Sequence, residues 1–276
     1  MKIGKHFMFT RTTALVLALS IGFVAVAEAQ RRHPVSGRVF APVMGVGGAG
    51  WLERPEREAE EAPSKALAAL ELKPGMVVAD IGAGSGYYTS RMSKLVGAAG
   101  KVYATDIQPG MIELLNRRIK AEGLANVTPV LGAMEDPALP AASIDLAIMV
   151  DVYHELQNPQ VFLQKLRPVF KPGGRLVLVE FRKEDPNVPI LPVHKMSVAE
   201  VKLELEAEGF VLDKVIDVLP WQHIIVLKVA PAKRVGLQLP GFQLARRAGA
   251  AGGSGPDTAR RASRRHARAR RIFCRA

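Results

Sequence analysis

Two hydrophobic patterns alternate along the middle of the chain. Short apolar runs of strand length are separated by longer segments in which apolar residues recur every three or four positions. Short apolar runs are typical of strands buried on both faces, and the longer spacing is typical of amphipathic helices. This alternation predicts a doubly wound α/β domain over residues 70–230. The expected strands are 76–81, 101–105, 127–131, 144–150, 175–180, 210–218 and 224–229, and the expected helices are 86–96, 109–122, 159–170 and 198–208.

The last two expected strands follow each other without a helix between them. They should therefore form an antiparallel closing pair on an otherwise parallel, seven-stranded sheet. The Lys-Pro-Gly-Gly sequence at 171–174 is expected to form a turn that leads into the fifth strand. A ligand of such a sheet binds beyond the carboxyl ends of its strands.

The segment before the domain, residues 30–69, has no strand pattern. Residues 31–50 are rich in Gly, Pro and Val and predict an extended leader. Residues 51–70 are charged and favour helix, so one or two short helices over the domain are expected. Trp51 and Arg54 make the beginning of this stretch a candidate lid, with an ordinary solvated helix face as the alternative.

The first 29 residues have the pattern of an export signal. Lys2, Lys5 and Arg11 precede an apolar run over 14–27, and the run closes with an A-x-A pattern that ends at Ala29. The run is shorter than the ~20 residues that span a bilayer, which favours cleavage after Ala29 over an uncleaved anchor. We therefore expect an exported, periplasmic protein with no stable membrane span after cleavage.

The net charge of +12 is concentrated in the C-terminal residues 231–276. This tail holds 12 Lys and Arg residues against one acid, and it is predicted to be disordered because it has few large apolar residues. The rest of the chain is close to neutral and offers no broad basic face, so no specific nucleic-acid partner is expected. The single cysteine, Cys274, excludes an internal disulfide and a Cys-based zinc site, and the sequence predicts no metal site.

A glycine-rich loop follows the first strand. The strand contains Asp80, and Gly82, Gly84 and Gly86 come after it in a D-x-G-x-G-x-G pattern. Glycines let the backbone turn tightly and approach a ligand at the start of the next helix. A dinucleotide-binding loop needs a further glycine where this chain has Tyr87, which disfavours an NAD-dependent oxidoreductase.

Asp106 ends the second strand, beside this loop. A carboxylate in that place can accept hydrogen bonds from both ribose hydroxyls of a nucleoside. The alternative is that it caps the helix starting at 109.

Five motifs carry a resemblance to a known family. Residues 70–229 resemble class I S-adenosylmethionine-dependent methyltransferases, especially the small-molecule branch similar to the ubiquinone and menaquinone biosynthesis enzymes. The resemblance implies a Rossmann-like fold, S-adenosyl-L-methionine as cofactor and a small-molecule methyl acceptor. The motifs are DIGAGSG at 80–86, KVYATD at 101–106, SIDLAIMVDVYHEL at 143–156, FKPGGRLVLVE at 170–180 and EGF at 208–210.

The same resemblance implies positions for the cofactor. Asp80 would lie near its amino group, Asp106 would hold the ribose, and Ile107 would pack on the adenine. Glu135 or Asp136 would meet the adenine amino group, because alanine stands directly after Gly132, where the family commonly has aspartate. The loop residues Gly82, Ala83, Gly84 and Gly86 would cross the methionine part.

The end of the fourth strand holds the candidate catalytic residues Asp151, Tyr153 and His154. In the family that this chain resembles, residues at this place lie between the cofactor and the acceptor. Asp151 is expected to border the cofactor as well. With its ordinary pKa of ~6.5, His154 is the candidate general base, and Tyr153 could orient the acceptor. A purely structural role for His154 is the alternative.

Three further residues, Glu180, His194 and Trp221, are candidates for the acceptor pocket, or ordinary strand-end and loop residues. An exported, non-catalytic S-adenosylmethionine-binding module is an alternative function. A DNA amino-methyltransferase is disfavoured, because the fourth strand is followed by Asp-Val-Tyr-His and lacks a Pro-Pro pair. The sequence indicates neither the acceptor nor the oligomeric state.

Overall fold

A computed structural model describes residues 32–231. The predicted export signal and basic tail lie outside the described residues. Seven strands lie side by side in the order β3-β2-β1-β4-β5-β8-β7, and the two-residue β6 pairs with β5. The strands are β1 (Val77–Ile81), β2 (Lys101–Asp106), β3 (Val127–Leu131), β4 (Ile144–Val150), β5 (Phe170–Arg182), β6 (Lys195–Met196), β7 (Phe210–Ile216) and β8 (Gln222–Val229).

Strand β8 is antiparallel to both of its neighbours, β5 and β7. Every other pairing in the sheet is parallel. This confirms the mostly parallel, Rossmann-like sheet with an antiparallel closing strand. The carboxyl ends of β1, β2 and β4 therefore meet at one edge, where side chains from distant parts of the sequence come together.

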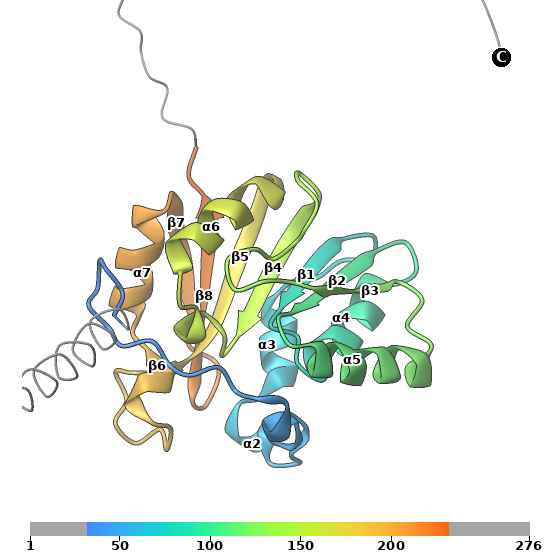
Figure 1. The fold of residues 1–276 in the computed structure, drawn as a ribbon, viewed down its shortest axis with the longest axis horizontal. Coiled ribbons are helices and arrows are strands. Elements are labelled where there is room, and N and C mark those ends of the chain that lie inside the picture. Colours follow the sequence, from blue (N-terminus) through green and yellow to red (C-terminus); the bar gives the residue numbers. More distant parts are fainter. Residues whose placement is uncertain (1–31, 232–276) are drawn as a thin grey trace, which may run out of the picture. The chain divides into compact units, whose positions relative to one another are not determined.

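Helices cover both faces of the sheet (Figure 1). Alternate residues of β4 divide between two cores: Leu146 and Ile148 pack toward α3 to α5, whereas Ala147 and Met149 pack toward α6 and α7. This two-sided burial explains why the strand is almost continuously apolar. The α-helices are α2 (Arg57–Glu60), α3 (Pro63–Ala69), α4 (Tyr87–Val96), α5 (Pro109–Glu122), α6 (Pro159–Leu166) and α7 (Val198–Ala207), and the 3-10 helices are η1 (Val46–Glu53), η2 (Tyr153–Glu155), η3 (Arg167–Val169) and η4 (Pro192–His194).

The expected turn at 171–174 is wrong, because these residues belong to β5. Gly173 takes a φ of +80°, and the pairing with β4 shifts between Ile144 and Leu146. The glycine thus produces an irregularity in the ladder, and the chain does not reverse. The preceding helix also ends earlier than expected, since η3, which contains Pro168, intervenes before β5.

The leader contains a turn at 34–36, and its end is not extended as expected, because η1 begins at Val46. One of its side chains is a buried anchor. Arg38 is 7% exposed, and its Nε donates to Glu204 Oε1 on α7 at 2.8 Å. Its Nη1 donates to the carbonyl of His154 at 3.0 Å. These contacts fix the leader along the carboxyl edge of the sheet. Within residues 32–231, no helix is long and apolar enough to cross a membrane.

Candidate active site

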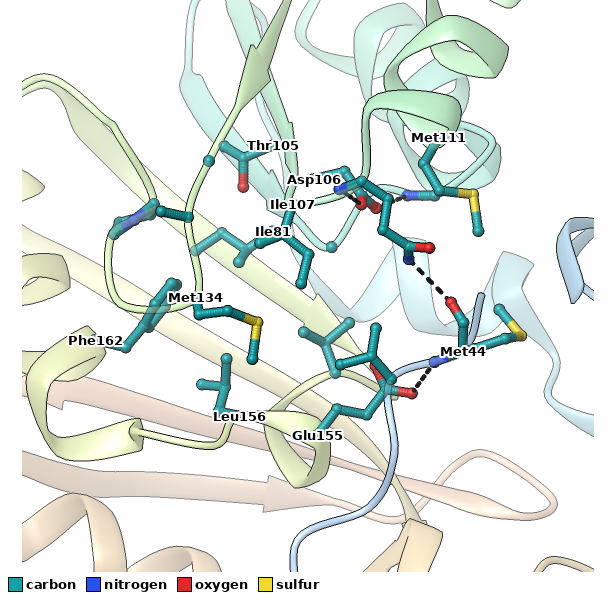
Figure 2. Close-up of a pocket in the computed structure, with 18 of the residues that line it drawn as sticks. Met44, Ile81, Thr105, Asp106, Ile107, Met111, Met134, Glu155, Leu156 and Phe162 are labelled. Atoms are coloured by element: carbon teal, nitrogen blue, oxygen red, sulfur yellow. Dashed lines mark hydrogen bonds between the residues drawn. The ribbon is translucent and has the colours of Figure 1, made fainter. Parts of the chain in front are cut away.

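A cavity lies at the carboxyl ends of β1, β2 and β4 (Figure 2). It contains about 800 Å³ of empty space, including the part that opens to solvent. Its walls are mostly apolar, with polar groups concentrated on Asp106, Gln108, Asp136, Asp151 and Glu155.

Two glycines of the loop after β1 line this cavity. Gly82 and Gly84 have φ values of +72° and +55°, in the left-handed region that favours glycine. A Cβ on Gly82 would lie 2.5 Å from a Val152 methyl group, and a Cβ on Gly84 would lie 2.6 Å from Leu52 Cδ1. Both positions favour glycine for their backbone conformation, and a Cβ on Gly82 would in addition press against the stiff, branched side chain of Val152.

The other loop residues support the cavity from outside its lining. Gly86, at φ +85°, leads into α4, and a Cβ there would lie 2.7 Å from Leu115 Cδ1. Ala83 is buried, and the amides of Gly82 and Ala83 donate to the carbonyl of Thr105 at 2.8 and 2.9 Å. These bonds fasten the loop to the end of β2.

Asp106 is 7% exposed and faces the cavity with its carboxylate held in place. Its Oδ2 accepts from the amide of Gly84 at 3.0 Å, and its Oδ1 accepts from the amide of Gln108 at 2.9 Å. Burial raises the pKa of Asp106, and these amides partly offset that effect. The Asp106 side chain does not cap α5, whose N-cap is Gln108. Each carboxylate oxygen retains capacity for a second hydrogen bond.

Asp80 lies beneath the loop and outside the cavity lining. It is 3% exposed, and its Oδ2 accepts from Thr89 Oγ1 of α4 at 2.5 Å. Burial raises the pKa of Asp80 to about 6. In this structure Asp80 joins β1 to α4.

On the opposite wall, Ile107 and Asp136 line the cavity, whereas Glu135 does not. Glu135 points away and accepts from Asn158 Nδ2 at 2.7 Å. Asp136 Oδ1 accepts from the amide of Ala138 at 2.8 Å, which lowers the pKa of Asp136. Of the two acids predicted near an adenine, Asp136 is the one at the cavity.

Asp151 follows β4, lines the cavity and has a φ of +53°, which is strained for a residue other than glycine. Its Oδ2 accepts from Gln222 Nε2 at 2.6 Å, while its buried Oδ1 has no hydrogen-bond partner among the described residues. Burial, together with the nearby carboxylates of Glu61 and Glu180, raises the pKa of Asp151 well above its ordinary value.

Tyr153 and His154 do not line the cavity. Tyr153 is fully buried, and its hydroxyl donates to Glu204 Oε2 at 2.8 Å, so that hydroxyl is engaged in the core. His154 is 2% exposed, with Nδ1 2.6 Å from Glu180 Oε2 and Nε2 3.2 Å from His194 Nδ1. Trp221 is absent from the lining as well. The catalytic roles of Tyr153 and His154 therefore stay predictions.

Residues 43–53, which we call the lid, close one side of the cavity through Val43, Met44 and Leu52. The carbonyl of Met44 accepts from Gln108 Nε2 at 3.0 Å, and its amide donates to Glu155 Oε1 at 3.1 Å (Figure 2). The expected lid residue Trp51 is 47% exposed and stacks on Arg54. The sequence of the leader has no periodicity that could have revealed this contact.

Glu155 is a cavity residue that the sequence analysis missed. Its carboxylate lines the pocket next to Leu156, and burial raises the pKa of Glu155 to about 7. The only signal was its place directly after His154 in the third motif, at 143–156.

Comparisons with known proteins agree with this geometry. Residues 79–178 match the methyltransferase domain family. A stretch of 117 residues is 31% identical to the ubiquinone/menaquinone biosynthesis C-methyltransferase of Burkholderia multivorans, covering 42% of this chain and 48% of that protein. A stretch of 150 residues is 32% identical to the protein-L-isoaspartate O-methyltransferase of Ignicoccus hospitalis, covering 54% and 63%. The chain thus spans about half of the first relative and less than two thirds of the second.

The crystal structure of an S-adenosylmethionine-dependent methyltransferase from Aquifex aeolicus matches over a larger part of the chain. It superposes with a TM-score of 0.64 at 31% identity, and the match covers 68% of this chain and 100% of that one. Because a relative this similar is matched over its whole length, the chain belongs to the class I S-adenosylmethionine-dependent methyltransferases.

Proposed function

We propose that the protein transfers a methyl group from S-adenosylmethionine to a small-molecule acceptor. The observation that carries the proposal is the junction of Gly84 and Asp106 at the cavity wall, where the loop amide itself orients the carboxylate. A nucleoside sugar placed there would meet two preoriented acceptor oxygens.

The residues present fit this cofactor at three points. The loop lines the cavity with backbone at Gly82 and Gly84, where the positive φ values favour glycine. Asp106 has free acceptor capacity for two hydroxyls. The partnerless Oδ1 of Asp151 suits an ammonium group, because an unsatisfied buried acceptor is costly and a cationic donor would relieve that cost.

When bound, S-adenosylmethionine supplies an electrophilic methyl group on a sulfonium. The chain then has to hold an acceptor in line with it, and such positioning alone can lower a barrier by ~7–11 kcal/mol. Met44, Leu156 and Phe162 give the cavity an apolar side that suits a small, largely apolar acceptor. The role of His154 as the general base remains a prediction. Its ring does not line the cavity, so an acceptor bound there would contact it only after a rearrangement.

The export of the protein is part of the proposal. It is supported by the basic residues, the apolar run and the A-x-A pattern of the first 29 residues, and it places the protein in the periplasm after cleavage at Ala29. Fractionation of cells that express the tagged gene, with N-terminal sequencing of the mature protein, tests it.

Replacing Asp106 with alanine tests the cofactor site. We expect Asp106→Ala to weaken binding of the demethylated cofactor, S-adenosylhomocysteine, at least 10-fold in calorimetry, because both ribose acceptors are lost. The exposed Asp217→Ala is the matched control and should bind as the wild type does. Unchanged affinity in Asp106→Ala would remove this residue from the site.

Methyl transfer itself is tested with a labelled cofactor. Wild-type protein incubated with methyl-labelled S-adenosylmethionine and an envelope extract should label a small molecule. Binding of the cofactor with no labelled product in any extract would favour a non-catalytic binding module.

A further inference from the structure

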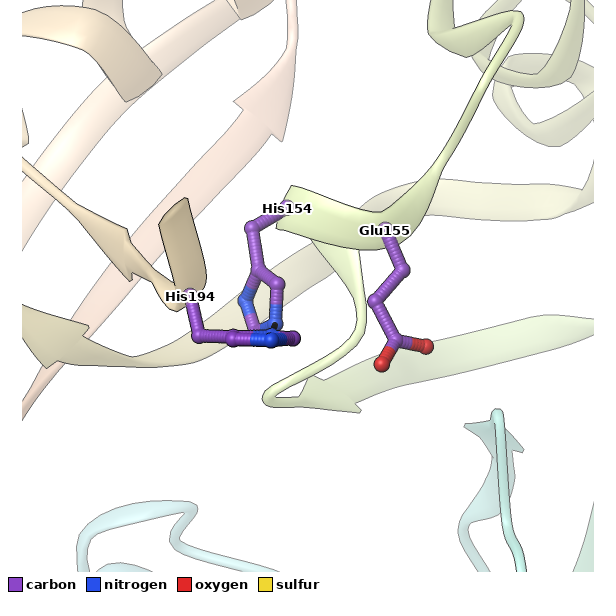
Figure 3. A group of neighbouring side chains, drawn as sticks. All are labelled: His154, Glu155 and His194. Atoms are coloured by element: carbon purple, nitrogen blue, oxygen red, sulfur yellow. Dashed lines mark hydrogen bonds between the residues drawn. The ribbon is translucent and has the colours of Figure 1, made fainter. Parts of the chain in front are cut away.

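Three side chains that can ligate a metal ion lie close together beside the cavity: His154, Glu155 and His194 (Figure 3). Their ligand atoms all lie within 4.8 Å of one another. They come from η2 and η4, which are 40 residues apart in the sequence, and this separation explains why the sequence predicts no metal site.

The ring of His154 is oriented for coordination. Its Nδ1 lies 2.6 Å from Oε2 of Glu180, which is fully buried and also accepts from the amide of Tyr153 through Oε1. A carboxylate in this place accepts the Nδ1 proton and leaves Nε2 unprotonated, at 3.2 Å from His194 Nδ1. Metal-binding histidines in proteins have this kind of carboxylate partner as a rule.

The second histidine is at the distance that coordination requires. Nδ1 of His194 lies 3.2 Å from Nε2 of His154, with the two rings nearly perpendicular at 87°. Two nitrogens that bind one tetrahedral zinc at ~2.0–2.1 Å are about 3.3–3.4 Å apart. A shared proton between the two rings also fits this separation, so a binding measurement has to separate the two arrangements.

Glu155 supplies the carboxylate and connects the cluster to the cavity. One of its oxygens accepts from the amide of Met44, while the other is available for a cation. Because Glu155 lines the cavity, an ion beside it would be adjacent to the space proposed for the acceptor.

We propose that His154, His194 and Glu155 bind a divalent transition-metal ion, with Glu180 orienting His154. Two imidazoles and one carboxylate form the ligand set of open zinc sites, so Zn²⁺ is the ion expected. The fourth position of such a site is open to an oxygen ligand. A contribution of that position to acceptor binding would rest on the proposed methyltransferase function, whereas metal binding does not.

The test is calorimetric titration of the tag-free, chelator-treated protein with zinc chloride. We expect one zinc ion per chain and at least 10-fold weaker binding in His194→Ala, whose ring is only partly buried. Glu184→Gln, an exposed carboxylate in the same loop, is the matched control and should bind as the wild type does. Glu180→Gln should weaken binding by about 10- to 100-fold, as loss of a ligand-orienting carboxylate does.

Cobalt binding gives a second readout. Co²⁺ in place of zinc should give visible absorption bands that vanish in His194→Ala and persist in Glu184→Gln. A wild type that binds no zinc, or a His194→Ala variant that binds it equally well, overturns the proposal. Titration with S-adenosylhomocysteine keeps the two proposals separate, because His194→Ala should bind it normally, and a failure of the wild type to bind it would count only against the methyltransferase function.

Discussion

Gly84 combines two constraints, a φ of +55° and a contact with the lid. An added Cβ would lie 2.6 Å from Leu52 Cδ1, so either the Leu52 side chain would have to turn away or the loop that holds Asp106 would have to move. A displacement of this loop separates the Gly84 amide from the Asp106 carboxylate. The residue therefore matters for the orientation of its neighbour as well as for the space it leaves.

We expect Gly84→Ala to weaken S-adenosylhomocysteine binding at least 10-fold. Gly123→Ala is the control, because Gly123 has a similar φ of +63° and nothing within 4 Å of an added Cβ. Both variants should lose about 1 kcal/mol or more of unfolding free energy from the left-handed backbone. Binding by calorimetry should differ between them, and equal affinities would argue against the contact.

Among the secondary-structure elements, those with strong periodicity were predicted to the residue. Strands β3 and β4 and helix α5 have the expected bounds, since α5 begins at a proline and ends before a glycine with positive φ. Four of the predicted site residues, Gly82, Gly84, Asp106 and Ile107, line the cavity because they lie at or just after strand ends.

The residues after β4 could not be assigned from sequence, because they form a strained residue followed by a 3-10 turn. In this short stretch the side chains diverge: Val152 packs on the glycine loop, Tyr153 contacts α7, His154 meets Glu180, and Glu155 enters the cavity. Neither the strand period nor the helix period applies to such a turn. The positions of these side chains follow from tertiary packing.

Helix α7 anchors the leader through one buried carboxylate, Glu204. It pairs with Arg38, accepts from Tyr153 and lies 3.3 Å from His33 Nε2. Removing it leaves a buried guanidinium without its partner, which costs about 3–5 kcal/mol in comparable sites. We expect Glu204→Ala to lose that amount in urea unfolding, while the exposed Glu206→Ala on the same helix stays within about 0.5 kcal/mol. A loss as small as the control's would mean that the leader is held by other contacts.

At the scale of the whole molecule, buried carboxyl groups make the free energy of unfolding depend on pH. Burial raises the pKa of Asp80 to about 6, from an ordinary value of 3.8, and the pKa values of Asp106 and Asp151 are raised too. A raised carboxyl pKa means that the folded state binds the proton more tightly than the unfolded state. The contribution of Asp80 to the free energy of unfolding is therefore fully present below about pH 4 and is lost as the pH rises through 6.

Asp80→Asn should remove this dependence. The variant should be more stable than the wild type at pH 7, by on the order of 1.4 kcal/mol for each unit by which the pKa is raised, and the difference should shrink toward pH 4. Urea unfolding at several pH values measures it, with the surface variant Asp213→Asn expected to show no such trend. A variant less stable than the wild type at pH 7 would contradict the expectation.

The main chain of Met44 joins the lid to two cavity residues, because its carbonyl accepts from Gln108 and its amide donates to Glu155. Substitution of Met44 leaves its carbonyl in place, and only proline removes its amide, so the side chain can vary without loss of these bonds. A molecule that enters past the lid has to break both bonds, and local opening of this kind occurs in microseconds to seconds. The ease with which this side opens is then set by a peptide group, whatever side chain position 44 carries.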